Sequence, residues 1–151
     1  MASVGPSRFA KSFKVAATVS AYHVVSFDTA TTSDGYVRVI HIPTETAHIL
    51  GIAQDTADTT SAQFQAVPVA SFGYAKVAAG ASVSAGAILT FVTTTAYAIE
   101  AGLGATFATG AFSTVGSVIP KTIGIALQKA SLTDAVLECF VHLGNTRVRI
   151  A

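Results

Sequence analysis

Eight short segments of the chain show the spacing of apolar residues that is typical of β-strands. In each segment apolar and polar residues alternate, or β-branched and aromatic residues run together, over four to nine residues. A period of two and an enrichment in Val, Ile and Thr suit a pleated sheet better than a helix. The segments are residues 12–19, 23–29, 36–42, 48–54, 62–70, 87–95, 122–130 and 135–143.

Turn-forming residues separate these segments. Clusters of Gly, Asp, Ser, Thr and Pro lie at 31–35, 42–45, 55–61 and 79–86, where they favour turns over continued strands. Residues 98–111 are the best candidate for a helix, but their three glycines disfavour one. We therefore predict an all-β fold, a compact β-barrel or sandwich.

The second half of the chain repeats the first. Three pairs of similar blocks occur in the same order, which predicts an internal duplication with halves of about 14–75 and 76–143. Two units are too few for a solenoid, so we expect two related halves of one β-barrel domain spanning 14–143. The pairs are VSAYHVVSF (19–27) with VSAGAILTF (83–91), KVAA (14–17) with KVAA (76–79), and LGIAQDTADTTSAQF (50–64) with IGIALQKASLTDAVL (123–137).

Two glycines occupy matching positions in the third pair of blocks. Gly51 and Gly124 both lie in the middle of predicted strands. A glycine inside a strand weakens it unless the backbone bulges or another backbone comes close. We therefore predict a bulge or a close backbone approach at both positions.

The surface of the chain must be unusually poor in charge. Charged residues make up 11% of the sequence, against about 25% in an ordinary soluble domain. Hydrophobic residues reach 51%, and many of them are small, with 28 alanines. Because charge normally keeps a monomer soluble, we infer that other molecules cover much of this surface. The net charge of +1 and the lack of Lys/Arg runs argue against nucleic-acid and membrane partners.

Groups that could carry catalysis or hold a metal do not form a known pattern. His41, Glu45 and His48 lie within eight residues, but their spacing is not that of a zinc motif, and Pro43 interrupts it. We predict a polar hairpin loop between two strands there. Glycine-rich phosphate-binding motifs and GxSxG are absent. Cys139 lies in an apolar alternating run and is expected to be a buried, inert thiol. We expect no enzymatic activity, no metal and no cofactor.

The N-terminal residues 1–13 lie outside the repeat and differ from the rest. Their basic and aromatic residues allow two interpretations. The first is a disordered end followed by an edge strand. The second is an extended arm that orders on a partner, with its two phenylalanines as anchors and basic side chains that meet carboxylates. The candidate partner-contacting residues are Arg8, Phe9, Lys11, Phe13 and Lys14.

Three segments of the sequence carry a resemblance to a known family. Residues 79–89 (AGASVSAGAIL), then 123–127 (IGIAL) and the closing strand 135–143, resemble the small capsid decoration proteins of tailed bacteriophages, also called cement or head-stabilisation proteins. In that family a small-Gly-x-x-Val-x-x-Gly-x-x-Leu turn leads into a strand, and an Ile-Gly-x-Ala strand comes later. The resemblance covers about residues 48–143. The chain departs from it at 1–13, 95–121 and the tail 144–151.

The resemblance implies a β-barrel or β-tulip domain on the outer surface of an icosahedral phage head. It implies that the major capsid protein is the partner and that the chain forms homo-trimers at three-fold or quasi-three-fold positions. It further implies that the chain is made in the host cytoplasm and cements the expanded head against the pressure of packaged DNA. Two other classes stay open: another virion β-module, such as a tail-tube, tail-fibre or head-fibre domain, and a ligand-binding β-module, which the absence of Trp disfavours.

Overall fold

Strands make up all the regular secondary structure of the described residues. The computed structural model describes residues 9–28, 35–42, 48–60, 65–92, 95–100 and 121–145. The prediction of an all-β fold is confirmed, and within these ranges no helix is long and apolar enough to cross a membrane. The strands are β1 (Phe9–Val15), β2 (Val24–Phe27), β3 (Arg38–His41), β4 (Ile49–Ala53), β5 (Ala66–Ala78), β6 (Ile88–Phe91), β7 (Ala98–Glu100), β8 (Lys121–Ala126) and β9 (Val136–Asn145).

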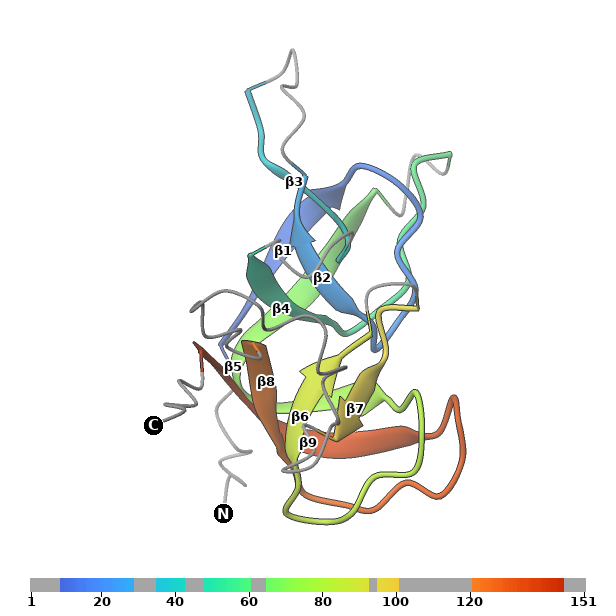
Figure 1. The fold of residues 1–151 in the computed structure, drawn as a ribbon. Helices are drawn as coiled ribbons and strands as arrows, with labels where there is room; N and C mark the ends of the chain where they lie inside the picture. The colour runs from blue at the N-terminus through green and yellow to red at the C-terminus, as the bar shows by residue number, and fades with distance from the viewer. Residues whose placement is uncertain are drawn as a thin grey trace, which may run out of the picture.

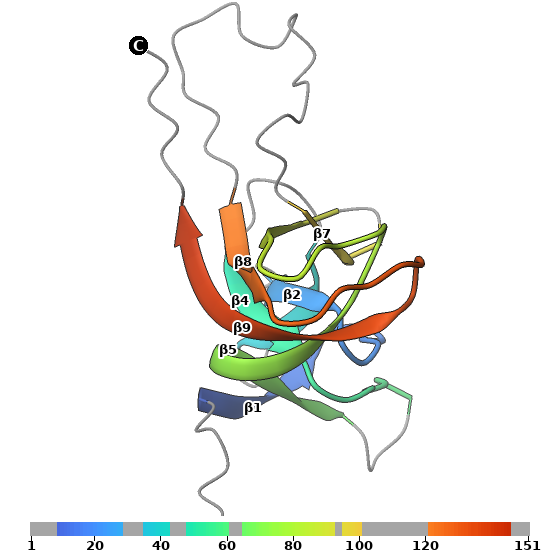
Figure 2. The ribbon, with the colours of Figure 1, turned by 90° about the horizontal axis from the view of Figure 1, so that it is seen from below.

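The long strand β5 organises the whole sheet. The strand order is β1-β3-β2-β4-β5-β9-β8-β6-β7, and β1 also pairs with β5, so the first five strands in this order close into a barrel. The first part of the 13-residue β5 pairs with β1 and β4, and its second part pairs with β9. β1–β4 lie at one end of the molecule and β6–β9 at the other, with β5 running between them (Figure 1). Two groups of strands therefore share one strand, which curves alongside β9 (Figure 2).

The second group of strands follows the plan of the barrel. β1 pairs with β3 in parallel, and in the second group a parallel bridge joins Ala79, directly after β5, to β7. Antiparallel bridges join Val19 to Ala57 and Val83 to Ala130, which are the positions that the repeat aligns. The duplication, a statement about ancestry, stays a prediction, and its proposed boundary at 75/76 falls inside the shared strand β5.

Gly51 of β4 and Gly124 of β8 let neighbouring strands approach more closely than a side chain would allow. Their φ angles are 156° and 157°, which residues with a Cβ rarely adopt. A Cβ added at Gly51 would overlap the carbonyl oxygen of Ala70, and one at Gly124 would overlap that of Phe140. The strand register also shifts beside both glycines. The predicted close approach of the backbone is therefore confirmed.

Small aliphatic side chains fill the interior. Over residues 73–77 of β5 and 137–141 of β9, every second residue is buried, such as Val77 and Cys139, while the residues between them are exposed or partly exposed. This alternation gives each strand one face toward the core and one away from it. A larger buried cluster draws on both groups of strands. The smaller cluster, within the barrel, consists of Val15, Val19, Val25, Val39, Ala53, Ala57, Val67 and Val69.

Residues 9–13 belong to the barrel, so the predicted arm of residues 1–13 is wrong in its extent. β1 runs antiparallel to β5, with Phe9 opposite Phe72 and Lys14 opposite Ala66. The described domain therefore begins by Phe9, and residues 1–8 lie outside the described ranges. The boundary at residue 14 came from the start of the repeat, whereas strand pairing with a distant segment decides where the barrel begins.

The connection between β3 and β4 is not the predicted hairpin. β2 lies between these two strands and pairs antiparallel with each of them. β3 and β4 therefore run parallel to each other, and the residues between them link strands that are not neighbours. The prediction failed because consecutive strands usually pair, while here β2 takes the central place.

We expect the substitution Gly124→Ala to prevent stable folding, because its Cβ would overlap the Phe140 carbonyl oxygen and force β8 from β9. Urea unfolding followed by circular dichroism should show no cooperative transition, or one at a much lower midpoint. Gly86→Ala is the matched control: Gly86 has φ of 83°, but nothing lies within 4 Å of an added Cβ, so its cost should stay at about 1–2 kcal/mol. Equal midpoints for the two variants would show that the close approach of β8 and β9 does not require glycine.

Candidate partner-binding surface

β1 carries four of the five residues that the sequence analysis singled out for partner contact. Lys11 and Lys14 are exposed, whereas Phe13 is partly buried against the barrel core. The Phe13 ring meets the ring of Phe27, the last residue of β2, edge to face, with centroids 5.9 Å apart. Arg8 lies outside the described residues, and of Phe9 only its backbone place in β1 is described. Phe13 is thus a packing residue of the barrel, and contact of these residues with a partner stays a prediction.

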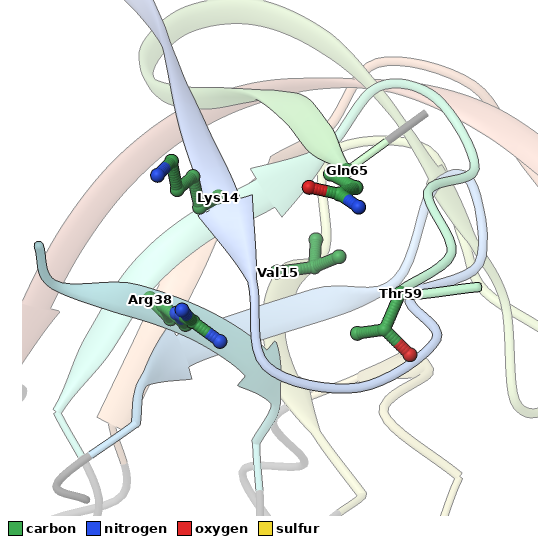
Figure 3. Close-up of a pocket in the computed structure, with 5 residues that line it drawn as sticks. All are labelled: Lys14, Val15, Arg38, Thr59 and Gln65. Atoms are coloured by element: carbon green, nitrogen blue, oxygen red, sulfur yellow. The ribbon is translucent and has the colours of Figure 1, made fainter. Parts of the chain in front are cut away.

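Lys14 and Arg38 lie side by side because β1 and β3 run parallel with these residues in register. They line a pocket of about 230 Å³ together with Val15, Thr59 and Gln65. The two basic side chains come from neighbouring strands, and Gln65 and Thr59 lie across Val15 from them (Figure 3). Guanidinium and ammonium groups beside an amide and a hydroxyl can bind a carboxylate through charge-assisted hydrogen bonds.

Aromatic rings extend the basic surface around this pocket. The Nζ atom of Lys14 lies 4.5 Å from the ring centroid of Tyr36, and that of Lys11 lies 5.7 Å from the ring centroid of Phe13. Tyr36 is 62% exposed. A cation held over a ring presents positive charge and apolar area together. We name Lys11, Lys14, Phe27, Tyr36 and Arg38 the basic-aromatic surface.

Tyr36 and Arg38 are surface partners of Lys14 that the sequence does not predict. Both residues lie in a segment that the sequence predicts only as a strand, and Arg38 is 24 residues further along the chain than Lys14. Their spacing of two does place them on one face of that strand. The parallel pairing of β1 with β3, which the sequence pattern does not reveal, brings this face beside Lys14.

A second, more open pocket of about 590 Å³ is built around Gln54. The Gln54 amide donates to the carbonyl oxygen of Lys76 at 3.0 Å and accepts from the Lys76 backbone N–H at 3.1 Å. The Gln54 side chain thereby satisfies both backbone groups of Lys76 in β5, as a neighbouring strand would. In the second group of strands the backbone N–H of Glu138 donates to the Gln128 side-chain oxygen at 3.4 Å. These amides satisfy backbone groups, which is a structural task.

His41 has a packing role at the junction of the two groups of strands. Its ring stacks on that of His23, with centroids 5.1 Å apart, and the ring of Tyr97, ahead of β7, lies 4.7 Å from that of His23. The backbone N–H of Ser20 donates to Nε2 of His41 at 3.0 Å. Burial, and to a smaller extent the neighbouring His23, lowers the pKa of His41. The bond from Ser20 requires a neutral acceptor nitrogen, which agrees with this direction.

The sequence trio His41, Glu45 and His48 is only partly described. His48 is exposed, and Glu45 lies outside the described ranges. Within those ranges no group of three or more His, Cys, Asp or Glu side chains could hold a metal ion. Cys139 is buried, as predicted, and burial raises the pKa of its thiol to about 12.

Comparison with solved structures shows a likeness in fold. No protein-family model matches the chain, and no curated protein matches it. Among solved structures, the chain is similar to the N base of head fibre gp8.5 of bacteriophage phi29, with a TM-score of 0.59 and 14% sequence identity. The similarity covers 95% of this chain and 100% of the phage chain. The two chains therefore share a fold over nearly their whole lengths.

Acid should destabilise the fold through His41. Because burial lowers the pKa of His41 from its ordinary value of 6.5, the unfolded chain binds this proton first as the pH falls. The contribution of His41 to the free energy of unfolding is therefore constant above about pH 6.5 and decreases as the pH falls below that value. We expect His41→Gln, which keeps an acceptor for Ser20 but does not titrate, to flatten the fall in thermal midpoint between pH 7 and 5. His48→Gln, at an exposed site, should leave the wild-type profile, and an unchanged profile in His41→Gln would refute the assignment.

Cys139 should resist thiol reagents in the native protein. Its burial and its pKa of about 12 leave almost no thiolate at pH 8. Iodoacetamide labelling followed by mass spectrometry is expected to modify the chain only in denaturing urea. Labelling of the native chain at the rate of a free cysteine would show that β9 opens readily.

Proposed function

We propose that this chain is a structural protein of a bacteriophage virion that binds the outer surface of the expanded head. On this proposal it cements neighbouring major capsid proteins against the pressure of packaged DNA. The observation that carries the proposal is the fold shared over 95% of the chain with the base of a phage head fibre. The resemblance of residues 79–89, 123–127 and 135–143 to capsid decoration proteins points to the same part of the virion.

The architecture suits a mechanical task. A closed barrel has no free strand edge, and in this molecule β5 ties the barrel covalently and by hydrogen bonds to the second group of strands. If the chain binds only the expanded shell, it stabilises the expanded shell by mass action, because the unexpanded shell does not bind it and gains no stability. This task needs contact area and rigidity, and we propose that it involves no catalysis, metal or cofactor.

The basic-aromatic surface is the proposed contact with the major capsid protein. Lys14 and Arg38 flank a pocket, and Tyr36 supplies exposed apolar area beside them. We propose that this pocket takes a carboxylate of the partner. Interfaces typically combine aromatic and Arg anchors in this way. The sequence resemblance further supports assembly of three copies at three-fold or quasi-three-fold positions of the head.

The base of a head fibre is a second candidate function, favoured by the fold that the chain shares with the head fibre base of phage phi29. A fibre base and a cement protein both attach to the head. They differ in what attachment does to the shell: a cement protein raises the resistance of the shell to heat, whereas a fibre base attaches without that requirement. The two candidates therefore separate in one experiment on capsids.

The test is sedimentation of the chain with expanded, decoration-free capsids of the phage that encodes it. We expect saturable binding and a capsid melting temperature that rises with occupancy. Saturable binding without a rise in melting temperature would favour the fibre base, and no binding would overturn both candidates.

Charge reversal locates the contact. Lys14→Glu should weaken capsid binding by tenfold or more, because a carboxylate of the partner would then meet like charge. Lys129→Glu, an exposed lysine outside the basic-aromatic surface, is the matched control. Equal weakening in the control would show that overall charge, and not this surface, matters.

A further inference from the structure

A row of apolar side chains crosses four neighbouring strands on the outward side of the second group. Tyr74 of β5 is the register partner of Phe140 of β9. Phe140 also pairs with Ile125 of β8, which in turn pairs with Ile88 of β6. Phe72, two residues before Tyr74 on β5, lies beside this row and is 50% exposed. We name Phe72, Tyr74, Ile88, Ile125 and Phe140 the outward row.

The outward row is a built surface and not a set of scattered exposed residues. Tyr74, Ile125 and Ile88 are each 45–46% exposed although they occupy adjacent positions. The rings of Phe72 and Tyr74 both meet the Phe140 ring edge to face, at centroid distances of 5.3 and 5.4 Å. Rings that are already packed lose little conformational entropy when a partner covers them.

The charges beside the outward row are matched to each other. Lys76 of β5 and Glu138 of β9 are register partners, both are exposed, and they lie two residues from Tyr74 and Phe140 along their strands. The row itself carries no charge. A partner face must therefore be apolar at its centre and must offer both an acid and a base at its margin.

We propose that the outward row binds a second copy of this chain. An identical face meets every one of these requirements: apolar residues for the row, a carboxylate for Lys76 and an ammonium group for Glu138. Sheets also pack face to face through the side chains that interdigitate between them. A purely basic partner would place like charge beside Lys76, and a purely acidic partner would place like charge beside Glu138.

The available area agrees with association between copies. A buried aromatic side chain contributes about 150–250 Å², so the exposed halves of the row with the nearby Leu127 and Val136, 43% and 47% exposed, offer on the order of 500 Å². A standard interface takes about 800 Å² from each partner. The row supplies the apolar centre of such an interface, and the polar margin around Lys76 and Glu138 supplies more.

This inference goes beyond the proposed three-fold assembly, because two identical faces that meet are related by a two-fold axis, and its test needs no capsid. Sedimentation velocity of the purified chain over a range of concentrations gives the assembly state directly. We expect wild-type protein to form a dimer or larger assembly, and Ile125→Lys to weaken self-association at least tenfold by placing a charge in the centre of the row.

Leu132→Lys is the matched control, since it makes the same change at a residue that is 73% exposed and lies outside the row. Tyr74→Thr, which keeps a good strand former, provides a second variant, and circular dichroism checks that each one folds. A monomeric wild type, or assembly that Ile125→Lys and Tyr74→Thr leave intact, would overturn the proposal. If the wild type is monomeric and a variant of the outward row loses capsid binding, the row contacts the capsid instead. If a row variant no longer self-associates but each chain still binds the capsid, the proposal is supported.

Discussion

The structure depends on β5 being paired along its whole length, first within the barrel and then with β9. A strand of 13 residues is long for a small domain, and here each part of it completes a different group of strands. Separating the two groups would break the backbone hydrogen bonds that one part of β5 makes and would expose the apolar side chains packed there. The two groups are therefore parts of one cooperative unit, although the sequence reads as two halves.

Close packing of backbone against backbone follows from the same arrangement. Gly51 and Gly124 remove side chains at the points where β4 approaches β5 and where β8 approaches β9. The interior is then filled mainly by valine and alanine, whose small volumes suit sheets drawn tightly together. A chain built this way spends few large side chains on its core. Much of its larger apolar surface is left on the outside, where it is available to partners.

The two exposed surfaces differ in chemistry and in position along the fold. The basic-aromatic surface lies on the barrel, on and beside β1 and β3, while the outward row crosses β5, β9, β8 and β6. A positive surface with a pocket that we propose as a carboxylate site suits a partner of different sequence, and an uncharged row with balanced charges at its margin suits a copy of the same chain. A protein with one surface of each kind can join its own copies while it is held on a larger assembly.

The sequence by itself determined eight of the nine described strands, all but β7, together with the special positions of Gly51 and Gly124 and the burial of Cys139, because these features follow from local periodicity and from the conformational range of single residues. Pairing between distant segments decided the rest. β1 entered the barrel through contacts with residues more than 50 positions away, Arg38 came to lie beside Lys14 through a parallel pairing, and the outward row arose from the register of four strands. Register is set by the packing of whole faces, so no local pattern could reveal which side chains would meet.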